Sequence, residues 1–191
     1  MFSSTSGRLR KGIRATGGAD FIGANFVHWT RERRPDVEIA ILNALTHASD
    51  GTNLAPVRPD ITFVGSAITD PALVDRLVAG TDVVVHFAAE SHNDNSLNES
   101  TPFVLTSVMG TFTILEAVRR HDVRLHHVST DEVYGDLELD DPKRFTEGPL
   151  FNPSSPYTST MAASDLLVRV WLRPLGVLAT LSNCSNSYGP H

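Results

Sequence analysis

Residues 16–23 read Thr-Gly-Gly-Ala-Asp-Phe-Ile-Gly, and this segment joins an apolar run to a helical pattern. The residues before it, 12–16, are predicted to form a strand, and residues 23–34 are predicted to form a helix. A strand, a glycine-rich turn and a helix in this order are the context that a dinucleotide fingerprint requires. Backbone amides at such a helix start can bind a pyrophosphate. The pattern therefore favours a nucleotide site, and the alternative is a turn whose glycines serve only close packing.

Short apolar runs and helical patterns alternate along the rest of the chain. The predicted strands are residues 12–16, 37–42, 61–64, 82–88, 125–129 and 177–182, and the predicted helices are residues 23–34, 71–79, 102–120 and 157–173. Runs such as residues 83–85 are apolar on both faces, which suits a parallel sheet covered by helices and joined by right-handed crossovers. We therefore expect an α/β fold with a doubly wound parallel sheet, which is Rossmann-like.

Ligands of such a sheet bind outside the carboxyl ends of the strands. Gly17, residues 88–91 and residues 130–132 all fall there in the expected fold, so they should converge on one crevice. Residues 136–156 are rich in Asp, Pro and Ser, and we expect a surface loop beside this crevice. Residues 1–11 are expected to be a disordered start, and residues 12–191 to form one domain.

Composition and charge exclude several classes of function. The 191 residues are 41% hydrophobic and 20% charged, with a formal net charge of -6, which argues against a general nucleic-acid binder. The single cysteine, Cys184, excludes an internal disulfide. No Cys/His set has metal-ligand spacing, so no metal site is expected, and packing explains His126 and His127 better. No run approaches the ~20 apolar residues of a membrane span, and residues 1–11 lack a secretory signal, which predicts a cytoplasmic protein.

Two side chains depart from the pattern of a dinucleotide site. Asp20 stands at the middle glycine of the turn spacing, where its carboxylate adds bulk and charge near the phosphates. Two like unit charges at ~4 Å and an effective dielectric of ~20 repel by about 4 kcal/mol. Asn43 ends the second predicted strand, where an acid would hold the adenosine ribose of NAD, and no Arg follows it to favour NADP. The pattern favours a nucleotide-site ancestry with weak binding.

Tyr157 and Met161 are four residues apart on one predicted helix, so they share a face. Short-chain dehydrogenases carry a Lys at the second position, which holds the nicotinamide ribose and lowers the pKa of the tyrosine. A thioether does neither. With the phenol near its reference pKa of ~10, about one molecule in a thousand is ionised at pH 7, and we expect a rate loss of that order. The alternative is a buried aromatic whose hydroxyl is merely hydrogen-bonded.

Asp131 and Glu132 follow the fifth predicted strand and are preceded by Thr130. A carboxylate pair beside a hydroxyl at the crevice favours a site, and the alternative is a solvated pair at a strand end. Neighbouring residues of a strand point to opposite faces, so irregular backbone is needed for both acids to reach one substrate.

Several segments together resemble the dTDP-glucose 4,6-dehydratases of the extended short-chain dehydrogenase/reductase superfamily. They are residues 16–23, 86–92, 129–135, 155–157, 162–165 and 184–190, so the similarity runs from about residue 12 to the last residue. The specific part is the acid pair after Thr130, which related sugar-nucleotide epimerases generally lack. The resemblance implies a Rossmann-like NAD-binding domain, NAD as cofactor, a dTDP-hexose as substrate and a homodimer formed through residues 102–120 and 157–173.

The resemblance also implies roles for individual residues in an internal redox dehydration to a 4-keto-6-deoxy sugar. Tyr157 would take the proton of the sugar 4-hydroxyl, which Thr130 orients, while hydride passes to NAD. Glu132 would remove the proton at carbon 5, Asp131 would protonate the departing 6-hydroxyl, and the hydride returns to carbon 6. Cofactor contacts would fall to Gly17, Gly18, Phe21, Ile22, Gly23, Asn43, Ala88, Ala89 and Ser91, and substrate contacts to Ser91, His92 and Asn186.

The chain departs from the family pattern where chemistry is expected. The departures are Asp20, Asn43, Ala67, Asn95, Ser107, Met161 and Asn183, and Arg14 interrupts the apolar first strand. The chain also stops at His191, whereas the family continues into the region that closes over the nucleoside diphosphate. A weak or inactive dehydratase is therefore expected. Two alternatives stay open: a non-catalytic remnant or nucleotide-binding pseudoenzyme, and another sugar-nucleotide epimerase or decarboxylase.

Overall fold

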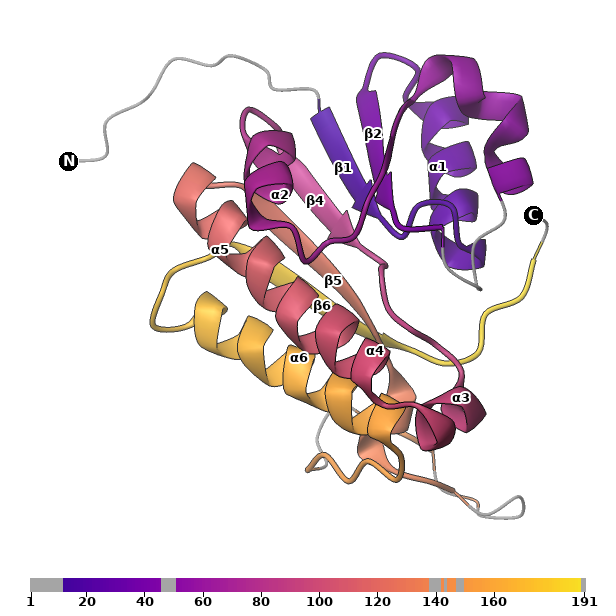
Figure 1. The fold of residues 1–191 in the computed structure, drawn as a ribbon, viewed down its shortest axis with the longest axis vertical. Coiled ribbons are helices and arrows are strands. Elements are labelled where there is room, and N and C mark those ends of the chain that lie inside the picture. The colour runs from indigo at the N-terminus through magenta and orange to yellow at the C-terminus, as the bar shows by residue number, and fades with distance from the viewer. Residues whose placement is uncertain (1–11, 46–50, 138–141, 143, 147–149, 190–191) are drawn as a thin grey trace.

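The structure is a computed structural model that describes residues 12–45, 51–137, 142, 144–146 and 150–189. Its sheet has six parallel strands in the order β3-β2-β1-β4-β5-β6 (Figure 1). The strands are β1 (Gly12–Thr16), β2 (Glu38–Asn43), β3 (Thr62–Gly65), β4 (Val83–His86), β5 (Arg124–Thr130) and β6 (Ala179–Cys184). The strand order reverses between β1 and β4, so the doubly wound fold is confirmed. The expected disordered start, residues 1–11, lies outside the described residues.

The helical segments match the predicted periodic stretches. They are α1 (Phe21–Arg33), α2 (Pro71–Val78), α4 (Thr101–Phe103), η2 (Val104–Gly110), α5 (Thr111–His121) and α6 (Pro156–Leu172), of which α4, η2 and α5 form one continuous stretch. Three short segments were not predicted: η1 (Gly51–Asp60), α3 (Asn93–Asn98) and η3 (Asp131–Tyr134). The η1 segment contains Pro56 and Pro59, and α3 is almost entirely polar, so neither shows the apolar spacing of a core helix.

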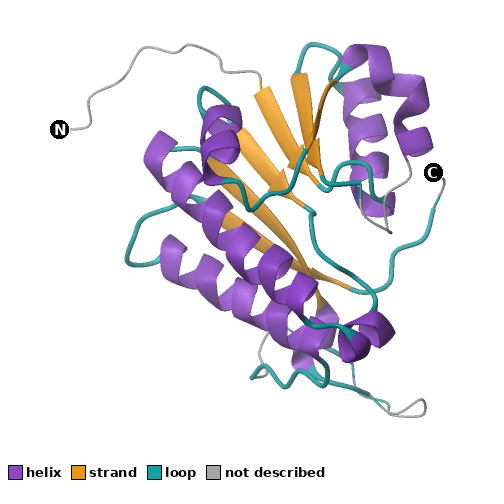
Figure 2. Ribbon diagram, in the orientation of Figure 1, coloured by secondary structure: helices purple, strands orange, loops and turns teal. Residues whose placement is uncertain are grey.

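Helices cover both faces of the sheet (Figure 2). On one face, α2, α5 and α6 pack on a cluster that includes Leu42, Val84 and Leu125. On the other face, α1 and η1 pack on a cluster that includes Ile39 and Ile41. Residues 41 and 42 of β2 thus serve opposite faces, as successive strand residues must. The two apolar layers fix the strands and so fix the edge at which their carboxyl ends meet.

Arg14 lies in the middle of β1, where an apolar residue was expected. Its side chain is only 17% exposed. Arg14 Nε donates to the Leu77 carbonyl oxygen at 2.8 Å, and Nη1 pairs with Glu38 Oε1 at 3.1 Å. The guanidinium is therefore hydrogen-bonded and paired with a carboxylate, which explains how a charged residue can lie in this strand.

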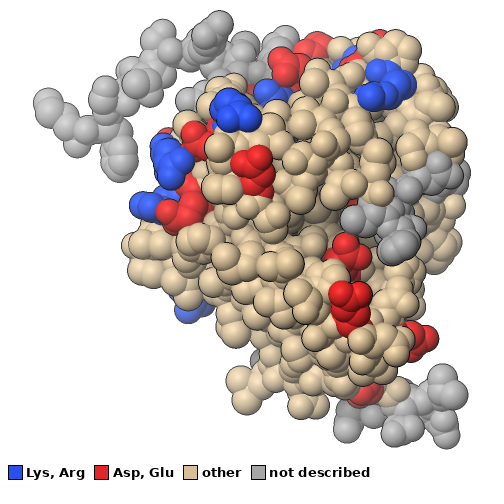
Figure 3. Space-filling model, in the orientation of Figure 1, with Lys and Arg blue, Asp and Glu red and all other residues tan. Residues whose placement is uncertain are grey.

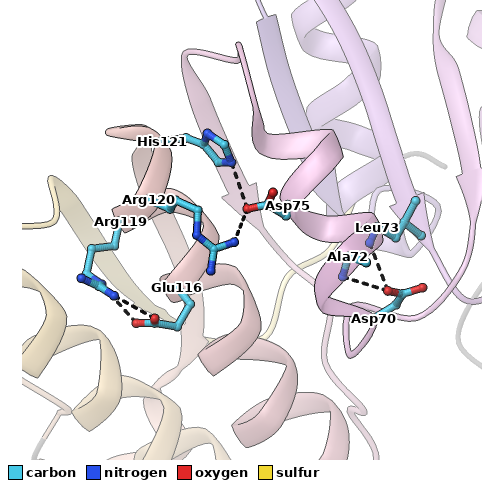
Figure 4. Close-up of polar contacts among 8 residues, drawn as sticks. All are labelled: Asp70, Ala72, Leu73, Asp75, Glu116, Arg119, Arg120 and His121. Carbon is cyan, nitrogen blue, oxygen red and sulfur yellow. Dashed lines mark hydrogen bonds and ion pairs between the residues drawn. The ribbon is translucent and has the colours of Figure 1, made fainter.

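Polar contacts tie the outer helices together (Figure 4). Asp70 caps α2 by accepting from the backbone N–H groups of Ala72 and Leu73, at 3.0 Å each. Asp75 of α2 accepts from Arg120 and His121, which end α5. The Arg120 and His121 contacts hold the pKa of the Asp75 carboxyl below its ordinary value. The carboxylate therefore favours the docked arrangement of α2 and α5 as long as it is ionised.

A second set of contacts joins α5 to α6. Glu116 pairs with Arg119 and accepts from Trp171 Nε1 at 3.0 Å, and the contact with Arg119 lowers the pKa of the Glu116 carboxyl. The Trp171 ring meets Phe112 edge to face at 5.8 Å between centroids. The two helices therefore form one layer over β4, β5 and β6.

One helical stretch among the described residues, 101–121, is long and apolar enough to cross a membrane by length and composition. The expectation that no run approaches ~20 consecutive apolar residues is not contradicted, because polar residues such as Thr111 and Glu116 interrupt this stretch. Its buried residues, among them Ile114, Leu115 and Val118, pack in the core cluster of the sheet. A core helix passes the same test, so the stretch gives little support for a membrane span.

Candidate functional site

The predicted site segments meet at the carboxyl edge of the sheet. The turn of residues 17–20 follows β1, residues 87–92 follow β4, and η3 follows β5. Because β4 lies between β1 and β5, the three segments lie next to one another (Figure 1). The predicted strand 82–88 ends at His86, and the residues beyond it form the irregular chain that borders the site. The expected convergence at one edge of the sheet follows directly from this strand order, although the edge holds two cavities instead of one crevice.

Two glycines of the turn are required by close backbone packing. Gly17 has a φ of +67°, and a Cβ there would lie 2.6 Å from the backbone N of Ala88. A Cβ on Gly23 would collide with the Gly17 carbonyl oxygen. Backbone atoms cannot move aside as a flexible side chain can. Packing alone therefore accounts for both glycines, and it also brings the backbone of residues 87–88 against the turn.

A cavity of about 380 Å³, called here the β2-side cavity, opens between the turn and the ends of β2 and β3. Gly17, Asp20 and Asn43 line it from the turn and β2, and Ala88 and Ala89 line it from the segment after β4. Glu90, expected at the crevice, and Ala67, one of the departures from the family pattern, also line it. Its remaining walls include Ser66, Ile68, Thr69, Thr101, Leu105 and Thr106, which were not predicted as site residues. Their signal was weak because they lie on loops and on an outer helix.

A second cavity of about 330 Å³, the tyrosine-side cavity, lies on the other side of the turn. Phe21, Ile22 and Gly23 line it from the start of α1, and Tyr157 and Met161 line it from α6. Ser91, His92, Phe87, Val128 and Ser129 complete its walls, and Asp20 and Ala89 line both cavities. The two cavities have the arrangement that the two halves of a dinucleotide need, but a carboxylate stands at their junction, where a diphosphate would lie.

The Asp20 carboxylate is turned toward β2 instead of toward the helix. Asp20 occupies the N-cap of α1 but makes no side-chain capping bond. Its Oδ1 accepts from Asn43 Nδ2 at 3.0 Å. Asn43 is buried, and its own Oδ1 accepts from the backbone N–H of Leu45 at 2.7 Å. Asp20 and Asn43, which depart from the dinucleotide-site pattern at two separate places in the sequence, are therefore in direct contact.

Tyr157 lies in the first turn of α6, which is fixed by a capping box of Ser155 and Thr158 with Pro156 at the first helical position. Burial and the nearby Glu132 carboxylate raise the pKa of the Tyr157 phenol to about 12, although a hydrogen bond with Thr130 acts the other way. Met161, one turn further, is only 4% exposed. With this pKa, about one Tyr157 in a hundred thousand is ionised at pH 7, a hundredfold fewer than the sequence argument assumed.

Asp131 and Glu132 lie in η3, a turn of 3-10 helix directly after β5. The irregular backbone that the sequence argument required is therefore present, and both carboxylates act on the pKa of Tyr157. Thr130 caps this turn, since its Oγ1 accepts from the backbone N–H of Glu132 at 3.3 Å. Partial burial raises the pKa of Asp131, which suits a proton donor.

Asn93 of α3 is a site residue that sequence reasoning missed. Its Nδ2 donates to Glu132 Oε2 at 2.7 Å, and its Oδ1 accepts from Ser155 Oγ at 2.6 Å. This one side chain therefore connects the acid pair to the start of the helix that carries Tyr157. The available signal was its position directly after residues 86–92, but the pairing with two distant segments leaves no trace in the sequence.

Other predicted residues take varied positions. Gly18 packs against Ile41 and lines neither cavity, while Ser91 and His92 border the tyrosine-side cavity with exposed side chains. Asn186 lies in the exposed chain after β6 and lines neither cavity, so the structure does not bring it to Tyr157. Asn183 of β6 donates to the fully buried Asp165 carboxylate at 2.9 Å.

Two histidines of the sheet, His86 and His127, are buried among polar neighbours, whereas His126 is only partly buried. His86 contacts Thr16 Oγ1 at 2.7 Å and Thr111 Oγ1 at 3.1 Å, and burial lowers its pKa well below the ordinary value. His127 lies 3.3 Å from Asp165 Oδ1, with its ring 5.1 Å from that of His86. Within the described part of the chain, no group of three or more His, Cys, Asp or Glu residues has the geometry of a metal site.

A family model described as GDP-mannose 4,6 dehydratase matches residues 15–191. The chain belongs to this dehydratase family. This chain is 62% identical to the dTDP-glucose 4,6-dehydratase of Mycolicibacterium smegmatis over 176 residues, which cover 92% of this chain and 53% of that protein. It is 61% identical to the enzyme of the same name from Mycobacterium tuberculosis, with the same coverage. The chain therefore spans about half the length of the curated relatives it matches.

Solved structures agree with this membership. A dTDP-glucose 4,6-dehydratase from Streptomyces venezuelae, solved with NAD and TYD bound, superposes with a TM-score of 0.87 at 42% identity, covering 94% of this chain and 57% of that one. The enzyme from Bacillus anthracis, in complex with NAD, superposes with a TM-score of 0.84 at 36% identity, covering 94% and 56%. The resemblance inferred from the sequence is thus confirmed for family and fold.

Proposed function

We propose that this chain is the NAD-binding domain of a dTDP-hexose 4,6-dehydratase in which proton transfer is strongly slowed. The observation that carries the proposal is that Thr130, Asp131 and Glu132 all act on the pKa of Tyr157, which lines the tyrosine-side cavity at the carboxyl edge of the sheet. The acid pair favours dehydration over epimerisation or decarboxylation, which need no second proton donor for a departing hydroxyl.

NAD is the proposed cofactor, and the residues fit its two nucleoside halves better than its diphosphate. The half that carries nicotinamide is assigned to the tyrosine-side cavity, beside Phe21, Ile22 and Ser91, and the other half to the β2-side cavity, beside Asn43 and Ala88. When bound, NAD would supply the hydride acceptor for carbon 4 and the donor for carbon 6. The Asp20 carboxylate at the junction weakens binding by repulsion of the diphosphate.

The chain's own residues supply the proton transfers. Tyr157 takes the proton of the 4-hydroxyl, which Thr130 orients through its contact with the phenol. Glu132 removes the proton at carbon 5, and Asp131 gives a proton to the 6-hydroxyl as it leaves as water. The raised pKa of Asp131 favours its protonated form for this step. The high pKa of Tyr157 and the thioether at Met161 make the first transfer the slow one.

Incubation with dTDP-glucose and NAD tests the activity, with mass spectrometry to detect the loss of one water. We expect slow formation of the 4-keto-6-deoxy sugar, abolished in Glu132→Gln, which keeps the shape of the side chain but removes the base. If the parent forms product above background and Glu132→Gln forms the same amount, the assigned roles are contradicted. No product in either protein would favour the second candidate, a nucleotide-binding pseudoenzyme, which Asp20 and Met161 support.

The proposed setting is the cytoplasm, where Cys184 stays a free thiol. The proposed partner is a second copy of the chain, which docks through the exposed apolar residues of η2, α5 and α6. Nucleic acid is not a proposed partner, because a net charge of -6 opposes general binding to phosphates.

A further inference from the structure

The contact between Asp20 and Asn43 has a fixed geometry. The backbone N–H of Leu45 points at Asn43 Oδ1, at 2.7 Å, so the amide must turn its NH2 group the other way. That NH2 group donates to Asp20 Oδ1 at 3.0 Å. Asn43 is 4% exposed, so its amide has little freedom to rotate out of this arrangement. The backbone that follows β2 thus positions the Asp20 carboxylate through the Asn43 amide.

The same contact explains why Asp20 does not cap its helix. An Asp at an N-cap normally accepts from the backbone N–H of the second or third helical residue. Asp20 makes no such side-chain bond, although it occupies the N-cap of α1. The carboxylate instead lies at the wall of the β2-side cavity, where Asn43 is its neighbour.

This wall has the chemistry of a ribose site. The vicinal hydroxyls of a ribose are two adjacent O–H donors, which a carboxylate can accept together. In dinucleotide sites of this fold, an acid at the end of the second strand does so. Here that position is the neutral Asn43, and the carboxylate of Asp20 stands 3.0 Å from it. The pair carries one negative charge in total, as a single acid would.

The two positions also constrain each other. An Asp at position 43 would place a second carboxylate within about 3 Å of the first, which is unfavourable for both ionised groups. An amide at 43 is therefore the natural partner of an acid at 20. The contact between Asp20 and Asn43 therefore explains together the two departures from the dinucleotide-site pattern.

We propose that Asp20 and Asn43 together form the ribose-recognition element of the β2-side cavity, with the acceptor role moved from β2 to the glycine-rich turn. The ligand class is a nucleoside with a free 2′,3′-diol. Because Asp20 also borders the tyrosine-side cavity, the element disfavours phosphates that follow the ribose. The inference rests on the proposed function only in assigning a nucleotide to this cavity, and it does not depend on turnover.

Titration of the whole chain with adenosine, 2′-deoxyadenosine and ADP, followed by NMR chemical shifts, tests this assignment. In the parent we expect adenosine to bind about tenfold more tightly than 2′-deoxyadenosine, since a hydrogen bond to a charged acceptor is lost. ADP should bind no more tightly than adenosine. In Asp20→Gly the ratio of adenosine to 2′-deoxyadenosine affinities should fall to about one, because the acceptor is gone.

The double variant Asp20→Gly with Asn43→Asp restores an acid on β2 and opens the turn. We expect it to regain the preference for adenosine over 2′-deoxyadenosine and to bind ADP more tightly than adenosine, since phosphates favour an unobstructed helix start. Asn43→Asp alone should lose adenosine binding. Adenosine binding that is lost in Asn43→Asp and returns when Asp20→Gly is added means that the effects of the two substitutions are non-additive. Obstruction by Asp20 alone does not produce this result.

Two results would overturn the proposal: Asp20→Gly keeps the parent's preference for the 2′-hydroxyl, or the parent fails to bind adenosine while the double variant binds it. Asp20→Asn keeps the size of the side chain and so controls for a folding defect. It should lower the preference for adenosine over 2′-deoxyadenosine and raise the affinity for ADP relative to adenosine. Asp36→Asn, an exposed site at the other end of β2, is the matched control and should change none of the three affinities. No sugar nucleotide is used, so a chain that never dehydrates its substrate still gives a clear result.

Discussion

At the scale of single residues, the chemistry depends on how Tyr157 is surrounded. Its phenol is partly buried and faces two carboxylates, and both conditions oppose the phenolate. The residue that lies one helical turn away, Met161, brings no charge to offset them. The hydrogen bond with Thr130 is the single favourable influence, and it is outweighed. The site therefore has the base in position but in the wrong protonation state at neutral pH.

Met161→Lys should lower the pKa of Tyr157 by two units or more, because an ammonium group in the tyrosine-side cavity favours the phenolate. The measurement is the ultraviolet absorbance of phenolate against pH, with Tyr157→Phe to identify the signal. Leu172→Lys, which adds the same charge at the exposed end of α6, is the control and should leave this titration unchanged. An unaltered Tyr157 titration in Met161→Lys would show that the lysine position does not act on the phenol.

The pairing of Asp20 with Asn43, and of Asn93 with Glu132, could not be predicted from the sequence. The sequence identified Asp20, Asn43 and Glu132 as unusual or important one by one, because each stands in a recognisable motif. Their contacts join residues 23 and 39 positions apart, and they depend on how the strands pack. Motifs therefore located the site, while its internal hydrogen bonds needed the fold.

At the scale of elements, the contact of Asp75 with Arg120 and His121 joins α2 to α5 across the outer layer (Figure 4). The helices themselves were predictable, since their apolar spacing is strong. The short α3 and η1 were not, because their stability comes from tertiary contacts instead of local pattern. Helices with an apolar face that packs in the core can be predicted from the sequence, whereas short segments that only border a site cannot.

Asp75→Asn should lower the melting temperature at neutral pH. The pKa of Asp75 is depressed in the folded chain, so its contribution is present above the unperturbed value of 3.8 and is lost as the pH falls through the lower folded value. The difference between variant and parent should therefore shrink toward zero in acid. Thermal unfolding followed by circular dichroism at several pH values measures this. A difference that stays constant down to strongly acid pH would contradict the assigned ion pairs.

At the scale of the whole molecule, one face of the α4–η2–α5 and α6 layer is unusually apolar. Leu105, Met109, Leu166 and Val170 are each about half exposed there. Figure 3 shows that the surface over these helices is largely uncharged, whereas charged side chains gather toward the end of α5 and over α2. A contiguous apolar surface on two adjacent helices is typical of a protein–protein interface.

The double variant Met109→Glu with Leu166→Glu should therefore sediment as a monomer under conditions in which the parent is a dimer. Two carboxylates buried in an interface without partners oppose association. Leu178→Glu, at an exposed position outside both helices, serves as the control and should remain dimeric. A parent that stays monomeric at all accessible concentrations would remove the basis for the dimer.

The most direct test of the slowed proton transfer is the pH dependence of dehydration, measured as the initial rate of product formation from dTDP-glucose at saturating NAD. Because the pKa of Tyr157 is about 12, the rate should rise about tenfold for each pH unit between 7 and 9, without levelling off. A rapid rate at pH 7 that does not change over this range would contradict the account, since it would mean that Tyr157 is already ionised or is not the base.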